Sequence, residues 1–350
     1  NIKDNESTVQ FHNAPIWARF FTILAGPLAN IVFSVVVFSV LVFLTGVAND
    51  KPIIGKVDTL PFQNFDIKEG DTVLAMNRIP VKSFSDILSI YGQVGDQEEL
   101  EIQIKRGSET LMVRTKNLFQ PIVKDIEILS PSSRAGIMIG DLILKVNGTR
   151  IFEFSELKQF VQESSGRPLL LDIWRNGIEI QKTLIPENRP IETANGQLEE
   201  TLRIGIIGGF ALEPERISPG VLTSLKVGLT TTWRVVYGSI KGLIEMVKGS
   251  ISAKHLTGPI GIAHAITDVS KNGFIPFFSL VALISTGIAV INLFPLPVLD
   301  GGHLLLLAYE KLVGTAPSEA FMRVFMVFGL ALILSLMLFA TYNDLLRIIL

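Results

Sequence analysis

Three long apolar stretches constrain the fold of this chain more than any other feature of its sequence. They cover residues 20–49, 273–299 and 324–343, and each is long enough to cross a bilayer as a helix, which takes about 20 apolar residues. Hydrophobic residues make up 48% of the chain and charged residues only 18%, which is too apolar for an ordinary soluble protein. The sequence therefore predicts a membrane protein with a polar part between its first two spans.

Charge excludes one class of function and suggests an orientation. The net charge is −2 without a long basic run, so we expect no nucleic-acid partner. The chain has no cysteine, which excludes disulfides and cysteine-ligated metals. A cytoplasmic start for the first span is favoured by three basic residues, Arg19, Lys311 and Arg323. A polar segment at residues 1–13 precedes this span. Residues 50–272 would then lie in the periplasm.

The polar part contains an internal repeat at a constant offset of 70 residues. The octapeptide that begins at Gly70 recurs from Gly140, and the Phe-Ser pair at Phe84 recurs at Phe154. Each copy has alternating strand patterns, polar turns and one short helix. The sequence therefore predicts two copies of one α+β domain, at residues 50–118 and 119–212.

The second copy resembles a bacterial PDZ domain in the run from Ser133 to Gly148. This resemblance implies two tandem, circularly permuted PDZ domains that bind a peptide as an added strand, with a backbone loop for its terminal carboxylate. We expect that loop at Ile204, Gly205 and Ile206, although an edge strand with a glycine would give the same pattern. Residues 117–121 of the first copy lack such a glycine, so either that groove is vestigial or residues are missing there.

Residues 213–270 form a third region, in which residues 219–250 carry apolar side chains at helical spacing among lysines and arginines. This pattern predicts an amphipathic helix. The helix either lies on the membrane surface or packs against the protein core.

The chemical signal lies at the end of the second span, in the sequence NLFPLPVLDGG from Asn292 to Gly302. Pro295 and Pro297 must end or unwind the helix, and such backbone is tolerated at membrane depth only inside protein or beside a watery cavity. Asp300 follows closely. A carboxylate at such a place indicates a functional site, because burying it without a partner is costly and a metal ion is an efficient partner.

This sequence resembles the motif of the site-2 protease family, and AGPLAN from Ala25 to Asn30 is similar to a second motif of that family. The order of spans and domains resembles the RseP (regulator of sigma-E protease) branch, with residues 14–49 as one span and 271–350 as a pair. The resemblance implies that Asp300 binds zinc, that Asn292 holds the substrate backbone or the oxyanion, and that Pro295 and Pro297 shape the break. Asp300 as a helix cap and Asn292 as a polar plug between helices remain alternatives.

Such an enzyme also needs His-Glu-x-x-His, which supplies two zinc ligands and a general base. The four histidines of this chain form no such motif; they are His12, His255, His264 and His303. We expect the motif, with its general-base glutamate, on a helix upstream of the given residues. His303 is expected to be structural.

The resemblance implies an intramembrane zinc metalloprotease of the bacterial inner membrane that acts in regulated proteolysis during a stress response. Its expected substrate is a single-span anti-sigma factor with a trimmed ectodomain, with leftover signal peptides as others, and the PDZ pair would filter substrates by size. A membrane-anchored PDZ scaffold or an inactive relative is the alternative. A serine protease and a transporter fit the sequence less well, because neither a catalytic triad nor an inverted repeat is present.

Overall fold

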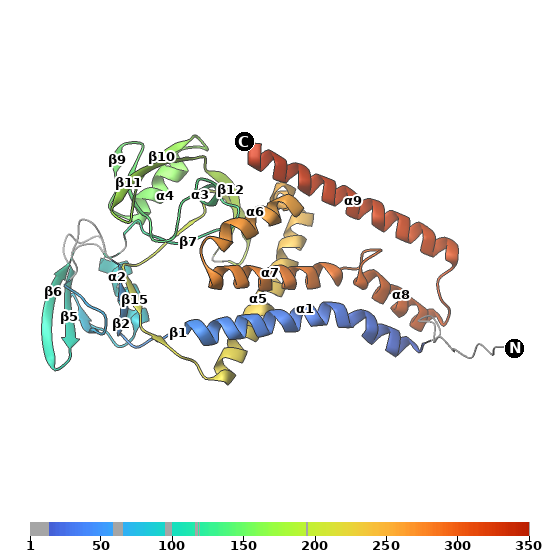
Figure 1. Ribbon diagram of the computed structural model, residues 1–350, viewed down its shortest axis with the longest axis horizontal. Coiled ribbons are helices and arrows are strands. Elements are labelled where there is room, and N and C mark those ends of the chain that lie inside the picture. The colour runs from blue at the N-terminus through green and yellow to red at the C-terminus, as the bar shows by residue number, and fades with distance from the viewer. Residues whose placement is uncertain are drawn as a thin grey trace. The chain divides into compact units, whose positions relative to one another are not determined.

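The computed structural model describes residues 14–58, 66–94, 100–115, 118, 120–193 and 195–349 (Figure 1). The polar segment at residues 1–13, with His12, and residues 117 and 119 of the first repeat lie outside this part. The described chain divides into two compact units. A helical unit holds the residues up to Leu41, residues 221–266 and those from 274 onward, and a β-rich unit holds residues 42–220 and 267–273.

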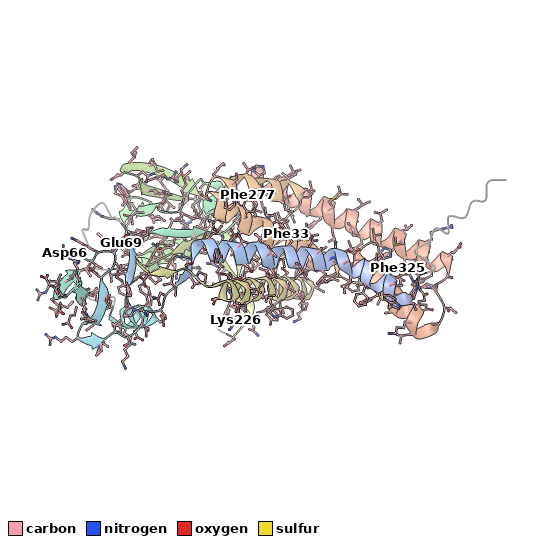
Figure 2. The ribbon with its side chains drawn as sticks, turned by 60° about the horizontal axis from the view of Figure 1, so that its bottom comes forward. Phe33, Asp66, Glu69, Lys226, Phe277 and Phe325 are labelled. Atoms are coloured by element: carbon pink, nitrogen blue, oxygen red, sulfur yellow. The ribbon has the colours of Figure 1, made fainter. Side chains whose placement is uncertain are left out.

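Three helices of the helical unit are long and apolar enough to cross a membrane, and they overlap the three spans predicted from sequence, although α7 ends seven residues before the predicted end of the second span. They are α1 (Ile16–Thr45), α7 (Phe274–Asn292) and α9 (Glu319–Ile349). Phenylalanines are distributed over all three, as Phe33, Phe277 and Phe325 show (Figure 2). Phe33 is exposed, as expected for a side chain that faces lipid. The other helices are α5 (Val221–Lys248), α6 (Pro259–Ser270) and α8 (Asp300–Val313).

Small and hydroxyl side chains bring α1 close to its neighbours. The Ser34 hydroxyl is fully buried and donates to the Ala282 carbonyl of α7 at 2.8 Å. A Cβ atom on Gly228 of α5 would lie 2.7 Å from the Val35 carbonyl of α1, so only glycine permits this approach. Such contacts are typical of membrane helices, whose association gains little from the hydrophobic effect.

The β-rich unit contains the repeat as two four-stranded antiparallel sheets of equivalent order, β4-β3-β5-β6 and β9-β8-β10-β11. The first sheet comprises β3 (Thr72–Met76), β4 (Ile79–Pro80), β5 (Leu100–Arg106) and β6 (Glu109–Thr115), and α2 (Phe84–Val94) follows β4. The second comprises β8 (Leu142–Val146), β9 (Thr149–Arg150), β10 (Leu169–Arg175) and β11 (Ile178–Leu184), and α4 (Phe154–Glu163) follows β9.

One ion pair recurs in both halves and explains the repeated Gly-Asp turn. Asp71 and Asp141 are each 1% exposed and accept from Arg106 and Arg175 at 2.7–2.8 Å. Each arginine is the last residue of a long strand, β5 or β10, and ties that strand to the Gly-Asp turn. The repeat seen in the sequence is therefore a repeat of structure.

The two halves are nested, which the sequence analysis did not anticipate. The chain leaves β7 (Val123–Ile126), passes through the short helix α3 (Pro131–Arg134) and the second sheet, and returns as β14 (Ile206–Gly208), which pairs with β7. It then continues as β15 (Leu212–Pro214), which pairs with β2 (Ile54–Val57) of the first half. The core of the first half includes Phe210 and Leu212, so this core is completed by residues that follow the second sheet.

A hairpin of β12 (Glu187–Glu192) and β13 (Leu198–Arg203) precedes β14. Two short strands, β1 (Val47–Ala48) and β16 (Arg216–Ile217), pair where the chain enters and leaves the β-rich unit.

Candidate functional site

The proline motif lies in a compact break between α7 and α8. Helix α7 ends at Asn292, and the next residues form tight turns in which the Phe294 carbonyl accepts from the Leu296 N–H at 2.7 Å. Val298 has a φ of 76°, a left-handed conformation that is rare for a β-branched residue. Strain of this kind concentrates at functional sites and costs about 1–3 kcal/mol. The break predicted from Pro295 and Pro297 is present, whereas α1 continues as a helix through Pro27.

The two glycines after Asp300 permit this compact geometry. A Cβ atom on Gly301 would lie 2.3 Å from the Leu293 carbonyl oxygen, and one on Gly302 would lie 2.2 Å from the Leu296 carbonyl oxygen. Helix α9 holds the break from another side, because a Cβ atom on Gly329 would lie 2.1 Å from Cβ of Pro297. Close backbone packing therefore fixes the position of Asp300.

Asp300 is the first residue of α8 and faces α1 at its Ala-Gly-Pro sequence. A Cβ atom added to Gly26 would lie 3.6 Å from Oδ2 of Asp300. The carboxylate has no hydrogen bond or ion pair with any described residue, and Leu299 rather than Asp300 occupies the N-cap position. A half-buried carboxylate without a partner suits a metal ligand, because a cation would satisfy it.

The other predicted site residues, Asn292, Pro295 and Pro297, lie within eight residues of Asp300 in the sequence. The Asn292 side chain makes no hydrogen bond within the described part of the chain. No group of three His, Cys, Asp or Glu residues that could hold a metal occurs among the described residues. His303 lies on α8, three residues after Asp300. Zinc takes about four ligands, so Asp300 fits the metal as one member of a larger set.

Comparison with known proteins decides the family. The sequence pattern described as Peptidase family M50 matches residues 1–336. The chain belongs to peptidase family M50. It is 29% identical to the "Regulator of sigma-E protease RseP" of Salmonella typhimurium, over 97% of this chain and 80% of that protein. The protein of the same name in Escherichia coli is 28% identical over 97% and 80%, and a "Putative zinc metalloprotease" of Vibrio cholerae is 26% identical over 99% and 83%. Together with three candidate spans, these relatives indicate an M50 membrane protease of the inner membrane.

Two contacts of buried charged side chains in the helical unit of this M50 chain were not predicted by the sequence analysis. Arg19 is 8% exposed and donates two hydrogen bonds to Glu310, at 2.6 and 3.0 Å, which joins α1 to α8. Asp344 of α9 is 1% exposed and accepts from the N–H groups of Gly258 and Gly261, where α6 begins. A charged residue in or beside an apolar stretch indicates a special role, so the sequence does single out these residues. It does not show their partners, because these are distant in the sequence.

The β-rich unit of the M50 chain contains a groove of about 330 Å³. Helix α4 forms one wall, the residues leading into β14 form the second, and the β12–β13 hairpin contributes the third. The lining includes the three residues predicted for the carboxylate loop, namely Ile204, Gly205 and Ile206. Gly205 has a φ of 78°, and a Cβ atom there would lie 2.2 Å from Cβ of Ser130, so this position requires glycine.

The first half has an aromatic pair beside its helix α2. Phe210 lies between β14 and β15 and contacts Tyr91 of α2, with ring centroids 5.1 Å apart. Its side chain is buried in the first core. This aromatic pair joins α2 to the segment that precedes β15.

Proposed function

We propose that this chain is an intramembrane zinc metalloprotease of the site-2 type, in which Asp300 supplies one zinc ligand. The observation that carries this proposal is the Asp300 carboxylate, which has no partner among the described residues and lies beside Gly26 at a strained helix break. The membrane-protease family and the zinc metalloprotease names of relatives support the same chemistry.

Zinc bound at Asp300 would activate a water molecule and polarise the scissile carbonyl. The chain's own residues would position the substrate. Asn292 has a side chain without an internal hydrogen bond, so its amide can donate to a substrate carbonyl or to the oxyanion that develops there. Pro295 and Pro297 lack N–H groups and interrupt the helix between α7 and α8. The irregular backbone at this break would lie beside the unwound substrate helix.

The β-rich unit is proposed to contain two circularly permuted PDZ domains that act as a size filter on the periplasmic side. Their repeated sheets, the groove at Ile204, Gly205 and Ile206, and the glycine requirement at Gly205 support this assignment. The nested strand β15 implies that residues 50–118 are completed by the segment around Leu212, rather than ending at 118. The proposed substrate is the transmembrane segment of a single-span anti-sigma factor after ectodomain trimming, with leftover signal peptides as further substrates.

The test is Asp300→Asn in the full-length protein. We expect cleavage of a single-span substrate to fall at least about 100-fold, because removal of a group that acts directly on the chemistry typically costs this much, while expression and membrane insertion stay normal. Zinc content, measured by mass spectrometry of the purified protein, should also fall. Asp125→Asn on the exposed face of β7 is the matched control. Full cleavage by Asp300→Asn would remove Asp300 from the active site.

A second candidate function is a membrane-anchored scaffold without catalysis. The observation that favours it is that no cluster of three metal-ligating side chains occurs within the described residues. Zinc analysis separates the two proposals. A full-length protein that binds no zinc and cleaves no substrate, yet still binds peptides, would be the scaffold.

A further inference from the structure

Helix α8 meets α1 at two levels within the helical unit (Figure 1). At the first residue of α8, Oδ2 of Asp300 lies 3.6 Å from a Cβ atom placed on Gly26. Near the other end of α8, Glu310 accepts two hydrogen bonds from Arg19, at 2.6 and 3.0 Å. Arg19 precedes Gly26 on α1, whereas Glu310 follows Asp300 on α8, so the two helices run antiparallel. Two contacts that are about 15 Å apart along α8 define both the position and the tilt of this helix on α1.

The Arg19 end supplies the directed bonds between the two helices. Gly26 has no side chain, so it limits how closely α8 approaches but cannot hold it. Arg19 presents a planar fork that matches the two oxygens of the Glu310 carboxylate. Its Nε atom also donates to the Ala14 carbonyl at 3.0 Å, which orients the guanidinium from its own chain. The two side chains are only 10% and 20% exposed, so these bonds are stronger than they would be in water.

Stability alone does not explain a largely buried ion pair. Two charges lose their hydration on burial, and this cost can exceed the attraction between them. Apolar residues of similar volume are often equally stabilising or more so. An ion pair with a bidentate arginine also supplies a defined geometry, because its two bonds form at only one relative position of the partners. The best-attested use of such groups is to set the register between helices.

The register of α8 on α1 matters because Asp300 is proposed as one member of a larger set of zinc ligands. The glycine contacts at the helix break place Asp300 relative to α7 and α9 through residues 293–297, but they do not align α8 with α1. The further zinc ligands are expected on a helix that precedes α1. Asp300 therefore completes the set only if α8 is aligned with α1 and with the chain that enters it. Arg19 contributes to both alignments, because it bonds to Glu310 and to the Ala14 carbonyl.

We propose that Arg19 and Glu310 are positioning residues that set the register of α8 on α1 and thereby hold the Asp300 carboxylate where it completes the zinc site. The pair acts on the reaction through Asp300 and does not touch the substrate. This inference rests on the proposed zinc site.

The test compares the full-length protein with the double variant Arg19→Leu with Glu310→Leu. Thermal unfolding in detergent measures stability, and competition with a chelating dye measures zinc affinity. We expect the double variant to regain much of the stability that Arg19→Leu alone loses, because two leucines avoid the cost of burying charges. Its zinc affinity should nevertheless fall about ten-fold, since residues that support a metal ligand typically contribute about 10–100-fold. A purely structural pair would let stability and zinc affinity recover together.

A distance between two spin labels reports the register without zinc. The labels are attached at Val36→Cys on α1 and at Leu312→Cys on α8, which are both exposed positions in a sequence of 350 residues without cysteine. Val36 lies about 25 Å from Arg19 along α1, so any sliding of α8 along α1 changes the distance between the labels. We expect one narrow distance distribution in the parent protein and a shifted or broader one in the double leucine variant.

Two further variants complete the test. The matched control is Lys248→Leu with Glu245→Leu, which removes an ion pair of 2.9 Å within the single helix α5 and should change neither the zinc affinity nor the distance. Arg19→Lys keeps the charge but loses the fork. Its zinc affinity should fall, although by less than that of the double leucine variant. This variant decides the question if the double leucine variant does not fold.

The outcomes separate the inference from the proposed function. A parent protein that binds no zinc would overturn the proposed zinc site together with the inference. If the parent binds zinc and the folded double leucine variant binds it equally tightly, only the inference is overturned, because the pair is then purely structural. An unchanged label distance in that variant would also overturn it. Where Arg19→Lys has to decide, an unchanged zinc affinity would count against the inference in the same way.

Discussion

The carboxylate of Asp300 lies against Gly26, so the first residue of α8 meets the glycine-proline sequence of α1. The distance from Oδ2 to a Cβ atom placed on Gly26 is 3.6 Å, an ordinary contact. Helix α1 leaves space beside the carboxylate at this point, and a larger side chain would occupy that space. The Ala-Gly-Pro motif of α1 and the proline motif before α8, which are far apart in the sequence, are therefore adjacent in the structure.

The first prediction concerns Gly26. Gly26→Ala should retain zinc and most of the cleavage activity, because one methyl group fits at 3.6 Å. Gly26→Leu should lose at least about ten-fold in activity, since misplacement near reacting groups by about 1 Å can cost more than that. The measurements are substrate cleavage and zinc content. Gly238→Leu on α5, where no atom lies within 4 Å, should leave both unchanged; equal losses in the two Leu variants would contradict the prediction.

The second prediction concerns the ion pair of Arg19 and Glu310, whose side chains are 10% and 20% exposed. Arg19→Leu alone should destabilise the helical unit by about 3–5 kcal/mol, because it removes the guanidinium that pairs with a largely buried carboxylate. The double variant Arg19→Leu with Glu310→Leu should recover much of this loss. Thermal unfolding in detergent measures both. An additive double variant would show that the two residues act independently.

The third prediction tests the nested arrangement of the β-rich unit. Phe210→Ala should destabilise this unit by about 3–5 kcal/mol, because it leaves a cavity in the first core. Hydrogen exchange should increase in α2, which contacts Phe210 through Tyr91. Phe152→Ala removes an exposed ring and serves as the control. If hydrogen exchange became faster only in the second sheet, Phe210 would support the second half instead of the first, and the prediction would be wrong.

The fourth prediction concerns acid stability. Burial alone would raise the pKa of Asp71, but hydrogen bonds from Arg106 and from the Lys68 N–H outweigh it and lower this pKa. A group whose pKa is lower in the folded state stabilises the fold above its unfolded pKa, about 3.9 for Asp. This stability is lost as the pH falls through the lower, folded value.

Circular dichroism of the full-length protein between pH 7 and pH 2 checks this expectation. Asp71→Asn should be less stable at neutral pH and should lose less stability on acidification than the parent protein. Asp125→Asn, on the exposed face of β7, should follow the parent curve. A parent-like curve for Asp71→Asn would show that another carboxylate controls acid unfolding.

The sequence by itself determined the features that arise from local chemistry. Three apolar stretches predicted α1, α7 and α9 because a span needs only length and hydrophobicity. The repeat predicted two similar sheets because the same pattern of turns and alternation folds in the same way. Pro295 and Pro297 predicted the break after α7 because proline cannot continue the helix, whereas helix α1 continues through Pro27.

Only the tertiary structure decided which distant residues meet. Strand β15 returns to β2 because the first core needs Phe210 and Leu212 to close it, and no local pattern shows which sheet a short strand will join. Because α8 packs against α1, Arg19 forms an ion pair with Glu310 and Asp300 lies beside Gly26. The sequence therefore named Asp300 from its motif, while the packing of separate helices placed its carboxylate beside Gly26.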